Sequence, residues 1–195
     1  VRLRERLAVA APGAKVAFST RSRPVDRERA LLDGRFDAAV DWLPPGRSRF
    51  EEIALFEDAI IAVARQDHPA IQRTRTKADL QRLDFVSLRP RADGDSAAPG
   101  IQEWSRLKLN MALEVSELLE ILVIAGQSDL VGLIPRSMLK LARDTFHLRA
   151  LPVVVTARTI PIKLFWTANR TSDPAQMFIR KHIEATSRTV TGRGM

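Results

Sequence analysis

Residues 55–69 read LFEDAIIAVARQDHP, and this stretch is the strongest indication of the fold. An acidic pair leads into the apolar residues 59–64, whose unbroken apolar character is typical of a strand buried on both faces. Pro69 lacks a backbone N–H and restricts the residue before it, so we expect the strand to end in a loop at His68. The stretch predicts an internal strand of an α/β core and contains no catalytic pattern.

Strand and helix patterns alternate along the rest of the chain. Helices are expected over residues 3–11, 24–33, 76–83, 101–107, 116–125, 135–143 and from 174 onward; strands are expected over residues 15–20, 36–42, 53–56, 59–64, 85–88, 111–115, 130–134, 148–155 and 160–168. Thr76 and Asp79 have the spacing of a capping box, and Ser116 is expected to cap the helix that follows it. The alternation predicts an α/β fold with largely parallel sheets that are covered on both faces.

The predicted elements separate into two lobes. Residues 1–63 together with 164–195 are expected to form the first lobe, and residues 64–163 the second. The chain would then cross twice between them, near Val63 and near Lys163. Such a pair of α/β lobes is expected to hold ligands at the carboxyl ends of its strands, in a cleft.

The composition narrows the function classes. The 195 residues include 45% hydrophobic residues, enough for a normal core, and no cysteine, which excludes disulfides, thiolate metal ligands and cysteine nucleophiles. The absence of cysteine also fits a reducing cytoplasm, and we expect a cytoplasmic protein. Neither a signal-peptide pattern nor a membrane-length apolar run is present. The net charge of +8 comes from 25 arginines and six lysines that are scattered among acids, which favours solvated faces over a direct nucleic-acid surface.

Catalytic and metal-binding patterns are missing. The three histidines, His68, His147 and His182, lie in separate elements without ligand spacing, and we expect no metal site. A Gly-rich phosphate loop and a Gly-x-Ser-x-Gly elbow are both absent, so no cofactor and no hydrolase chemistry is predicted. An enzyme stays as a third hypothesis, to be revived only by acid, base or nucleophilic groups that converge in the cleft.

Four blocks of sequence, taken in order, resemble the ligand-sensing domain of LysR-type transcriptional regulators. They are residues 31–40 (LLDGRFDAAV), residues 55–69, residues 123–135 (VIAGQSDLVGLIP), and residues 161–166 (PIKLFW) with 173–175 (DPA). The last block is similar to the subgroup of nodulation and aromatic-degradation regulators. Each block alone is common, and their shared order makes the resemblance specific.

The resemblance implies a type 2 periplasmic-binding-protein-like fold, with two Rossmann-like lobes joined by two crossover strands. It implies a small-molecule effector in the cleft, a homodimer of such domains that could form a tetramer in the full-length protein, and no membrane partner. DNA would be contacted only through an N-terminal helix-turn-helix domain, which these residues lack. The sequence departs from the family pattern in two places: Asp41 stands where the family often has Gly, and the strand before the first helix is missing.

The candidate effector contacts follow from strand ends together with the resemblance. They are Asp41, Trp42, Leu43, Ser87, Leu88, Arg89, Val115, Ser116 and Trp166. Trp42 would stack on an aromatic effector or pack under the Pro44-Pro45 loop, and Arg89 would clamp a carboxylate or stay exposed. The helix after Ser116 offers free N–H groups to an anion, whereas Trp166 fits core packing as well as ligand contact.

The resemblance also implies a dimer surface. Its candidates are Leu3, Leu7, Val16, Phe18, Leu119 and Leu122. Residues 118–124 are apolar around much of a helix, which either a subunit interface or deep burial in one chain would explain.

Two functions remain in competition beside the enzyme hypothesis. The first is the effector-sensing domain of a LysR-type regulator that binds an aromatic or carboxylated small molecule and controls transcription through oligomer geometry. The alternative is a periplasmic-type solute-binding protein of a transporter. A helix-turn-helix region upstream would support the first function, and a signal peptide the second.

Overall fold

The chain folds as two units in the computed structural model, which describes residues 2–19, 24–42, 49–89 and 107–189. The first unit contains residues 1–57 and 161–195, and the second contains residues 58–160. The chain leaves the first unit near the end of β2 (Phe50–Asp58) and returns to it at the start of β8 (Ile160–Thr167). Two long strands therefore carry both connections.

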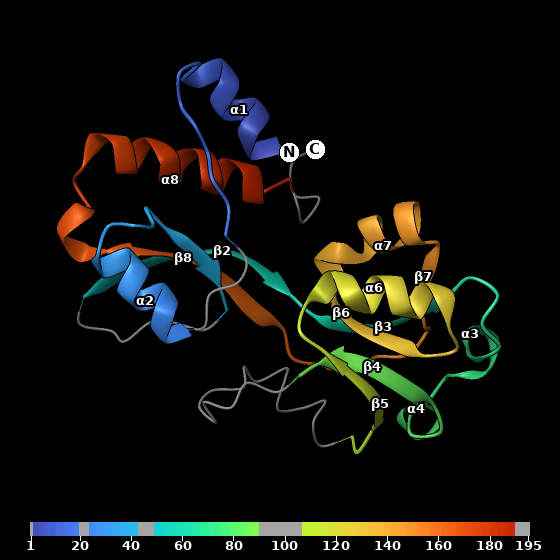
Figure 1. Cartoon of the computed structure of the whole chain (residues 1–195). Helices are drawn as coiled ribbons and strands as arrows, with labels where there is room; N and C mark the ends of the chain where they lie inside the picture. Colours follow the sequence, from blue (N-terminus) through green and yellow to red (C-terminus); the bar gives the residue numbers. More distant parts are fainter. Residues whose placement is uncertain (1, 20–23, 43–48, 90–106, 190–195) are drawn as a thin grey trace. The chain divides into compact units, whose positions relative to one another are not determined.

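The first unit is built on a three-stranded sheet with the strand order β1-β8-β2. Its other elements are α1 (Arg2–Ala10), α2 (Pro24–Leu32), β1 (Ala39–Asp41), the 3-10 helix η2 (Ala168–Arg170) and α8 (Pro174–Ser187). β1 runs antiparallel to β8, with Val40 opposite Leu164. In Figure 1, α8 lies along the sheet and α1 packs against α8.

Local sequence explains where the helices of this unit begin and end. Gly34 follows α2 with a φ of 70°, a left-handed conformation that glycine adopts without strain. α8 begins after Asp173, whose carboxylate accepts the N–H groups of Ala175 and Gln176 at 2.9 and 3.1 Å, with Pro174 in the first turn. Both boundaries were predicted from the sequence and are confirmed.

The second unit is built on a five-stranded sheet with the order β5-β4-β6-β3-β7. Its elements are β3 (Ile60–Arg65), α3 (Ala70–Arg73), α4 (Lys77–Leu80), β4 (Asp84–Leu88), β5 (Asn110–Val115), α6 (Leu118–Gln127), β6 (Val131–Pro135), the 3-10 helix η1 (Arg136–Met138), α7 (Leu139–Phe146) and β7 (Leu148–Ala150). α6 contacts β3, β4 and β6, and α7 packs beside β7 (Figure 1).

β3 is the internal strand that residues 59–64 predict. Ile61 and Val63 face a buried cluster that α6 and α7 complete, whereas Ala62 and Ala64 face a second cluster that contains Ala70 of α3. Consecutive side chains of a strand point to opposite faces, so an unbroken apolar run is required when both faces are covered. The prediction of a strand buried on both faces is confirmed.

The expectation of largely parallel sheets is wrong. β4 runs parallel to both β5 and β6, but β3 runs antiparallel to β6 and β7. β6 and β7 run in the same direction and are connected through the helix α7, as a parallel pair of strands requires, and β3 lies between them in the opposite direction. The sheet of the second unit is therefore mixed.

Two predicted strands differ from the structure. Residues 14–19 form no strand, because most of their side chains are exposed and no described strand pairs with them. Such a polar–apolar alternation forms a strand only where a neighbour supplies the ladder of hydrogen bonds. The strand expected over residues 148–155 is limited to β7, since Pro152 cannot donate to a ladder.

The remaining helices agree only in part with the sequence predictions. The capping box of Thr76 and Asp79 is present and opens α4. The short helix α3 after Pro69 was not predicted, and the helix expected over residues 101–107 lies outside the described residues except for its last residue. Among the described residues, no helix combines the length and the apolar character needed to cross a membrane.

Candidate functional site

Five predicted contact residues meet at one edge of the second unit's sheet. We call this region the β4–β5 edge; its members are Ser87, Leu88, Arg89, Val115 and Ser116. β4 and β5 are parallel with Leu88 opposite Val115, so both carboxyl ends lie together. The backbone N–H of Arg89 donates to the carbonyl oxygen of Val115 at 2.8 Å and extends the pairing beyond β4. The sheet topology therefore joins residues that are 26 or more positions apart in the sequence.

The members of the β4–β5 edge differ in exposure. Ser87 is buried, and its hydroxyl lies 3.4 Å from the carbonyl oxygen of Leu88, a long hydrogen bond. Leu88 is 38% exposed, and the side chains of Arg89 and Ser116 are exposed as well. Val115 is half-buried and packs against the cluster under α6. The edge thus offers an apolar side chain, a guanidinium and a hydroxyl to a ligand.

The first turn of α6 adjoins this edge and is capped differently from the prediction. The cap is Glu117, and the expectation that Ser116 caps the helix is wrong. Glu120 Oε2 accepts the backbone N–H groups of Ser116 at 3.0 Å and of Glu117 at 2.9 Å. Glu117 and Glu120 form a reciprocal capping box, a pattern in which an N3 Glu side chain satisfies the N-cap amide. The N–H groups that were expected to be free are therefore partly occupied by a carboxylate of the chain itself.

In the first unit, Asp41 ends β1 and forms an ion pair with Arg27 of α2. Its second oxygen, Oδ1, accepts the backbone N–H of Trp42 at 2.7 Å. The Asp41 carboxylate is thus held by the Arg27 guanidinium and by the backbone N–H of the next residue. Sequence reasoning missed Arg27, because a helix arginine surrounded by other charged residues gives no local sign of burial.

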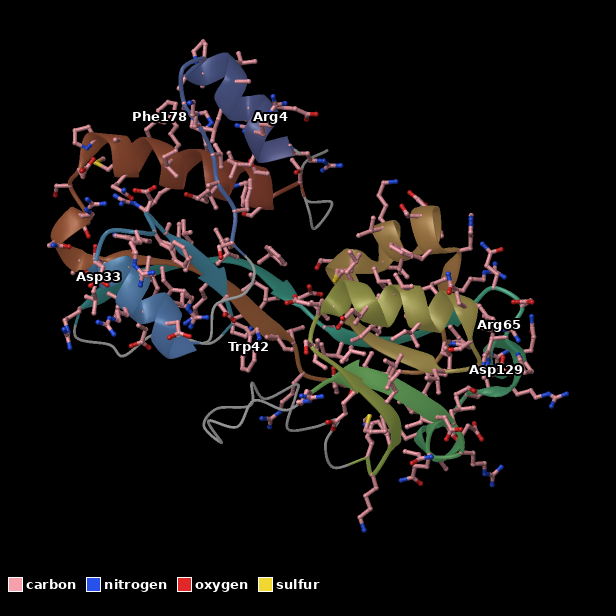
Figure 2. All side chains as sticks on the ribbon, in the orientation of Figure 1. Arg4, Asp33, Trp42, Arg65, Asp129 and Phe178 are labelled. Atoms are coloured by element: carbon pink, nitrogen blue, oxygen red, sulfur yellow. The ribbon has the colours of Figure 1, made fainter. Side chains whose placement is uncertain are left out.

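Trp42 follows β1 and its side chain is half-buried (Figure 2). Leu43, predicted beside it, lies outside the described residues. Trp166 has a different environment: it is buried, its indole N–H donates to the Thr171 hydroxyl at 3.0 Å, and the guanidinium carbon of Arg180 lies 4.5 Å from the ring centre. This placement gives Trp166 a packing role within the first unit.

The predicted interface residues divide by exposure. Phe18 is 71% exposed and Leu119 is 54% exposed, whereas Leu3 and Val16 are half-buried. Leu7 and Leu122 are buried within their own units, Leu122 in the cluster between α6 and the sheet. The apolar circumference of α6 therefore has two causes, because one side packs in the core while Leu119 and Val123 remain on the surface.

The charged turn after β3 is a structural ion-pair cluster. Arg65 donates to Asp129 from Nε at 3.1 Å and Nη2 at 2.7 Å, and its Nη1 lies 2.5 Å from Asp67 (Figure 2). These hydrogen bonds lower the pKa of both carboxyl groups and raise the pKa of Arg65. His68 Nδ1 accepts the N–H of Ala70, and Nε2 lies 3.0 Å from the carbonyl oxygen of Asp129. The cluster joins the end of β3 to the turn before β6.

No group of three metal-ligating side chains is found within the described ranges. A surface hollow of about 330 Å³ in the first unit is lined by residues of α1 and of the segment that follows it: Arg4, Leu7, Ala8, Pro12, Ala14, Lys15 and Val16. Two of these, Leu7 and Val16, were predicted for the subunit interface and not for the effector. All the residues that line the hollow belong to the first unit.

Comparison with known proteins identifies one family. The family described as LysR substrate binding domain matches residues 1–185. The chain is 26% identical over 179 residues to the HTH-type transcriptional activator NagR of a Ralstonia species, covering 92% of this chain and 59% of NagR. It is 25% identical over 180 residues to the HTH-type transcriptional activator NahR of Pseudomonas putida, covering 92% and 60%. The chain thus spans about 60% of these relatives.

A solved structure supports the fold independently. The regulatory domain of CcmR from Synechocystis PCC6803, in complex with 2-PG, matches with a TM-score of 0.75 and 13% identity, over 96% of this chain and 90% of that chain. This similarity confirms the predicted fold class, a type 2 periplasmic-binding-protein-like arrangement of two α/β lobes joined by two crossover strands. The relatives are named as transcriptional regulators and not as enzymes, which agrees with the expectation from the sequence.

Proposed function

The chain belongs to the LysR substrate binding domain family, and from this membership we propose that it is the effector-sensing domain of a transcriptional regulator. The observation that carries the proposal is the match of one family over residues 1–185, together with relatives named HTH-type transcriptional activators. The regulator would contact DNA through a helix-turn-helix domain outside these residues and would act in the cytoplasm. No comparison favours a transport protein, so that alternative is not carried forward.

The effector is a small molecule that contacts the exposed members of the β4–β5 edge: Leu88, Arg89, Val115 and Ser116. This proposal is supported by the meeting of two parallel strand ends, the position at which open α/β sheets hold ligands. Trp42, half-buried at the end of β1 in the first unit, was predicted as an effector contact through its indole ring and stays a prediction. We leave out Asp41, Ser87 and Trp166, because the first is paired with Arg27 and the other two are buried.

The two lobes of the sensor are the two units of the structure, residues 1–57 with 161–195 and residues 58–160; the sequence placed these boundaries a few residues later, at 63 and 163. A small molecule can shift a conformational equilibrium only through a difference in its affinity for the two states. Effector binding would therefore change the geometry of a homodimer, or of a tetramer in the full-length protein, and thereby reposition the DNA-binding domains. The exposed Leu119 and Phe18 are the proposed contacts between subunits.

Calorimetric titration of the purified chain with a panel of small aromatic and carboxylated compounds tests this function. We expect at least one compound to bind, and Arg89→Ala to weaken that binding roughly tenfold through the loss of a charge-assisted hydrogen bond. The matched control is Arg143→Ala, an exposed arginine of α7 beside Asp144, which should leave affinity unchanged. Equal affinity of Arg89→Ala and the wild-type chain would contradict the assignment of the β4–β5 edge.

A further inference from the structure

His68, in the turn after β3, is buried and uses both nitrogens of its ring. Only 5% of the residue is exposed. Nδ1 lies 3.0 Å from the backbone nitrogen of Ala70, and Nε2 lies 3.0 Å from the carbonyl oxygen of Asp129. A backbone N–H can only donate and a carbonyl oxygen can only accept, so Nδ1 carries no proton and Nε2 carries one. The two contacts therefore fix His68 as the neutral Nε2–H tautomer.

The hydrogen bond from Ala70 to His68 holds α3 against one face of β3. Ala70 is 5% exposed and packs in the buried cluster that contains Ala62 of β3. The carbonyl oxygen of His68 also accepts the N–H of Ile71 at 3.1 Å. Arg73, the charged residue of α3, is exposed. The start of α3 is thus bound to His68 through its side chain and through its backbone.

A proton on Nδ1 of His68 is incompatible with this arrangement. The imidazolium ring has two N–H groups, so Nδ1–H would face the N–H of Ala70 and the hydrogen bond between them would be lost. Either the ring or the start of α3 must then move, because a buried N–H without an acceptor is costly. Proton uptake by this ring therefore requires a local change of structure.

Charged side chains beside His68 supply counter-charges for a protonated ring. Asp67 in the same turn and Asp129 before β6 both interact electrostatically with His68, and Arg65 at the end of β3 pairs with both carboxylates (Figure 2). One guanidinium and two carboxylates leave one net negative charge. His147, after α7, reaches this turn through its carbonyl oxygen, which accepts a backbone N–H of the turn at 3.2 Å. The imidazolium is therefore not left without a counter-charge when it loses the bond from Ala70.

We propose that His68 is a pH-dependent switch within the second unit: protonation of Nδ1 releases the start of α3 from the turn after β3 and loosens the cover on that face of the strand. The switch acts in the range in which histidine side chains change charge, about pH 5 to 8. Such a switch needs a histidine whose hydrogen bonds suit one protonation state alone, and His68 has this property. The His68-Pro69 pair thus has a role beyond ending a strand.

NMR of the nitrogen-labelled 195-residue chain, recorded at several values between about pH 5 and pH 8, tests the switch. The ring nitrogens of His68 should show the Nε2–H tautomer at the upper end of this range and the imidazolium at the lower end. Hydrogen exchange of the Ala70 amide is measured in the same samples and corrected for the intrinsic pH dependence of exchange. We expect the protection of this amide to fall roughly tenfold as the ring takes up its proton, because one hydrogen bond is lost.

His68→Asn keeps an acceptor oxygen at the δ position of the side chain but has no group that titrates in this range. We expect the protection of the Ala70 amide in this variant to stay constant across the range. His182→Asn, on α8 of the first unit, is the matched control, since it removes a histidine that is distant in the fold from the turn. Its Ala70 amide should show the same pH response as that of the wild-type chain.

Each of three results would overturn the switch. The His68 ring could stay neutral down to about pH 5, or it could take up its proton while the Ala70 amide keeps its protection. In the third result, His68→Asn retains the wild-type pH response, so that another group drives it. The first two results come from the wild-type chain alone and therefore decide the question even if His68→Asn does not fold.

Discussion

The guanidinium of Arg27 on α2 donates to the carboxylate of Asp41 at the end of β1, with only 6% and 15% of the two side chains exposed. The pair joins a helix to the strand that carries Trp42. A charge that is buried without its partner is costly, so each residue of this pair depends on the other.

Arg27→Met is therefore expected to lower the free energy of unfolding by about 3 kcal/mol, because it removes the buried guanidinium that pairs with the Asp41 carboxylate. Arg29→Met on the same helix is the matched control: its ion pair with Asp33 spans 3.8 Å between exposed side chains, and we expect a change near zero. Urea unfolding measures both. If the two variants lose the same free energy of unfolding, the buried Arg27–Asp41 pair stabilises the fold no more than an exposed ion pair does.

Gly132→Ala is expected to destabilise the second unit by about 2 kcal/mol through overpacking. A Cβ at Gly132 would lie 2.7 Å from Ile121 Cγ2 and 3.3 Å from both Ala125 Cβ and Val63 Cγ2, between α6 and the sheet. Gly13→Ala is the control, since a Cβ added at Gly13 would meet no atom within 4 Å, and its Tm should be unchanged or slightly raised. A Gly132→Ala chain with the wild-type Tm would contradict the close packing of α6 on β6.

Asp129→Asn should alter the acid sensitivity of the chain. Hydrogen bonds from Arg65 lower the pKa of the Asp129 carboxyl group from its ordinary 3.8, so the unfolded chain binds the proton more tightly than the folded chain. The stabilisation by this carboxylate is complete above the ordinary value and is lost as the pH falls through the lower folded value. Denaturant unfolding at several pH values should show wild type and Asp129→Asn differing most above about pH 5 and converging below about pH 4.

The control for this prediction is Asp33→Asn, whose exposed ion pairs are longer, at 3.7 and 3.8 Å. We expect the free energy of unfolding of Asp33→Asn to change with pH in the same way as that of the wild-type chain. A stability difference between wild type and Asp129→Asn that widens on acidification would contradict the assigned direction.

Trp42→Ala and Trp166→Phe separate ligand contact from packing. Trp42→Ala should weaken binding of the aromatic compounds found by calorimetry roughly tenfold, with little loss of stability, because stacking on a ring contributes about 1 kcal/mol or more. Trp166→Phe removes the hydrogen bond to Thr171 and should lower stability by about 1 kcal/mol with affinity unchanged. The reverse assignment of the two tryptophans would be indicated if only Trp166→Phe lost affinity.

Leu119→Asp should weaken self-association of the chain, as measured by sedimentation equilibrium. Leu119 is 54% exposed on α6, so the change adds a charge to a proposed subunit contact without entering the core. Leu141→Asp on α7, with 44% exposure, is the matched control and should associate like the wild-type chain. A Leu119→Asp chain that associates as strongly as the control would place the interface elsewhere.

Predictions that depended on neighbouring residues were confirmed, and predictions that depended on a distant partner were not. The boundaries of α8 and of α4 depend on residues within one turn, namely Asp173 with Pro174 and Thr76 with Asp79, so local sequence was sufficient. The strand expected at residues 15–20 depended on a partner strand that local alternation cannot supply. The capping role of Glu117 was missed because Ser116 is also a good capping residue and lies directly before it.

The candidate contact residues also divide into those that local sequence identified and those whose surroundings only the tertiary structure revealed. Strand ends identified Leu88, Arg89, Val115 and Ser116, and the parallel register of β4 and β5 joined them. Core packing of Trp166 was one of the two roles expected for it from the sequence, whereas the ion pair of Arg27 with Asp41 gave no signal, since it joins a helix to a strand end 14 positions away.

The amino-acid order by itself determined the family, the α/β class and the strand of residues 59–64, because each of these follows from short-range patterns of polarity, turns and caps. Tertiary structure alone decided that β3 runs against its neighbours, that Asp41 is bound by Arg27, and that Glu120 occupies the amides at the start of α6. Strand direction and side-chain pairing depend on the position of distant segments in space, which patterns of neighbouring residues do not encode.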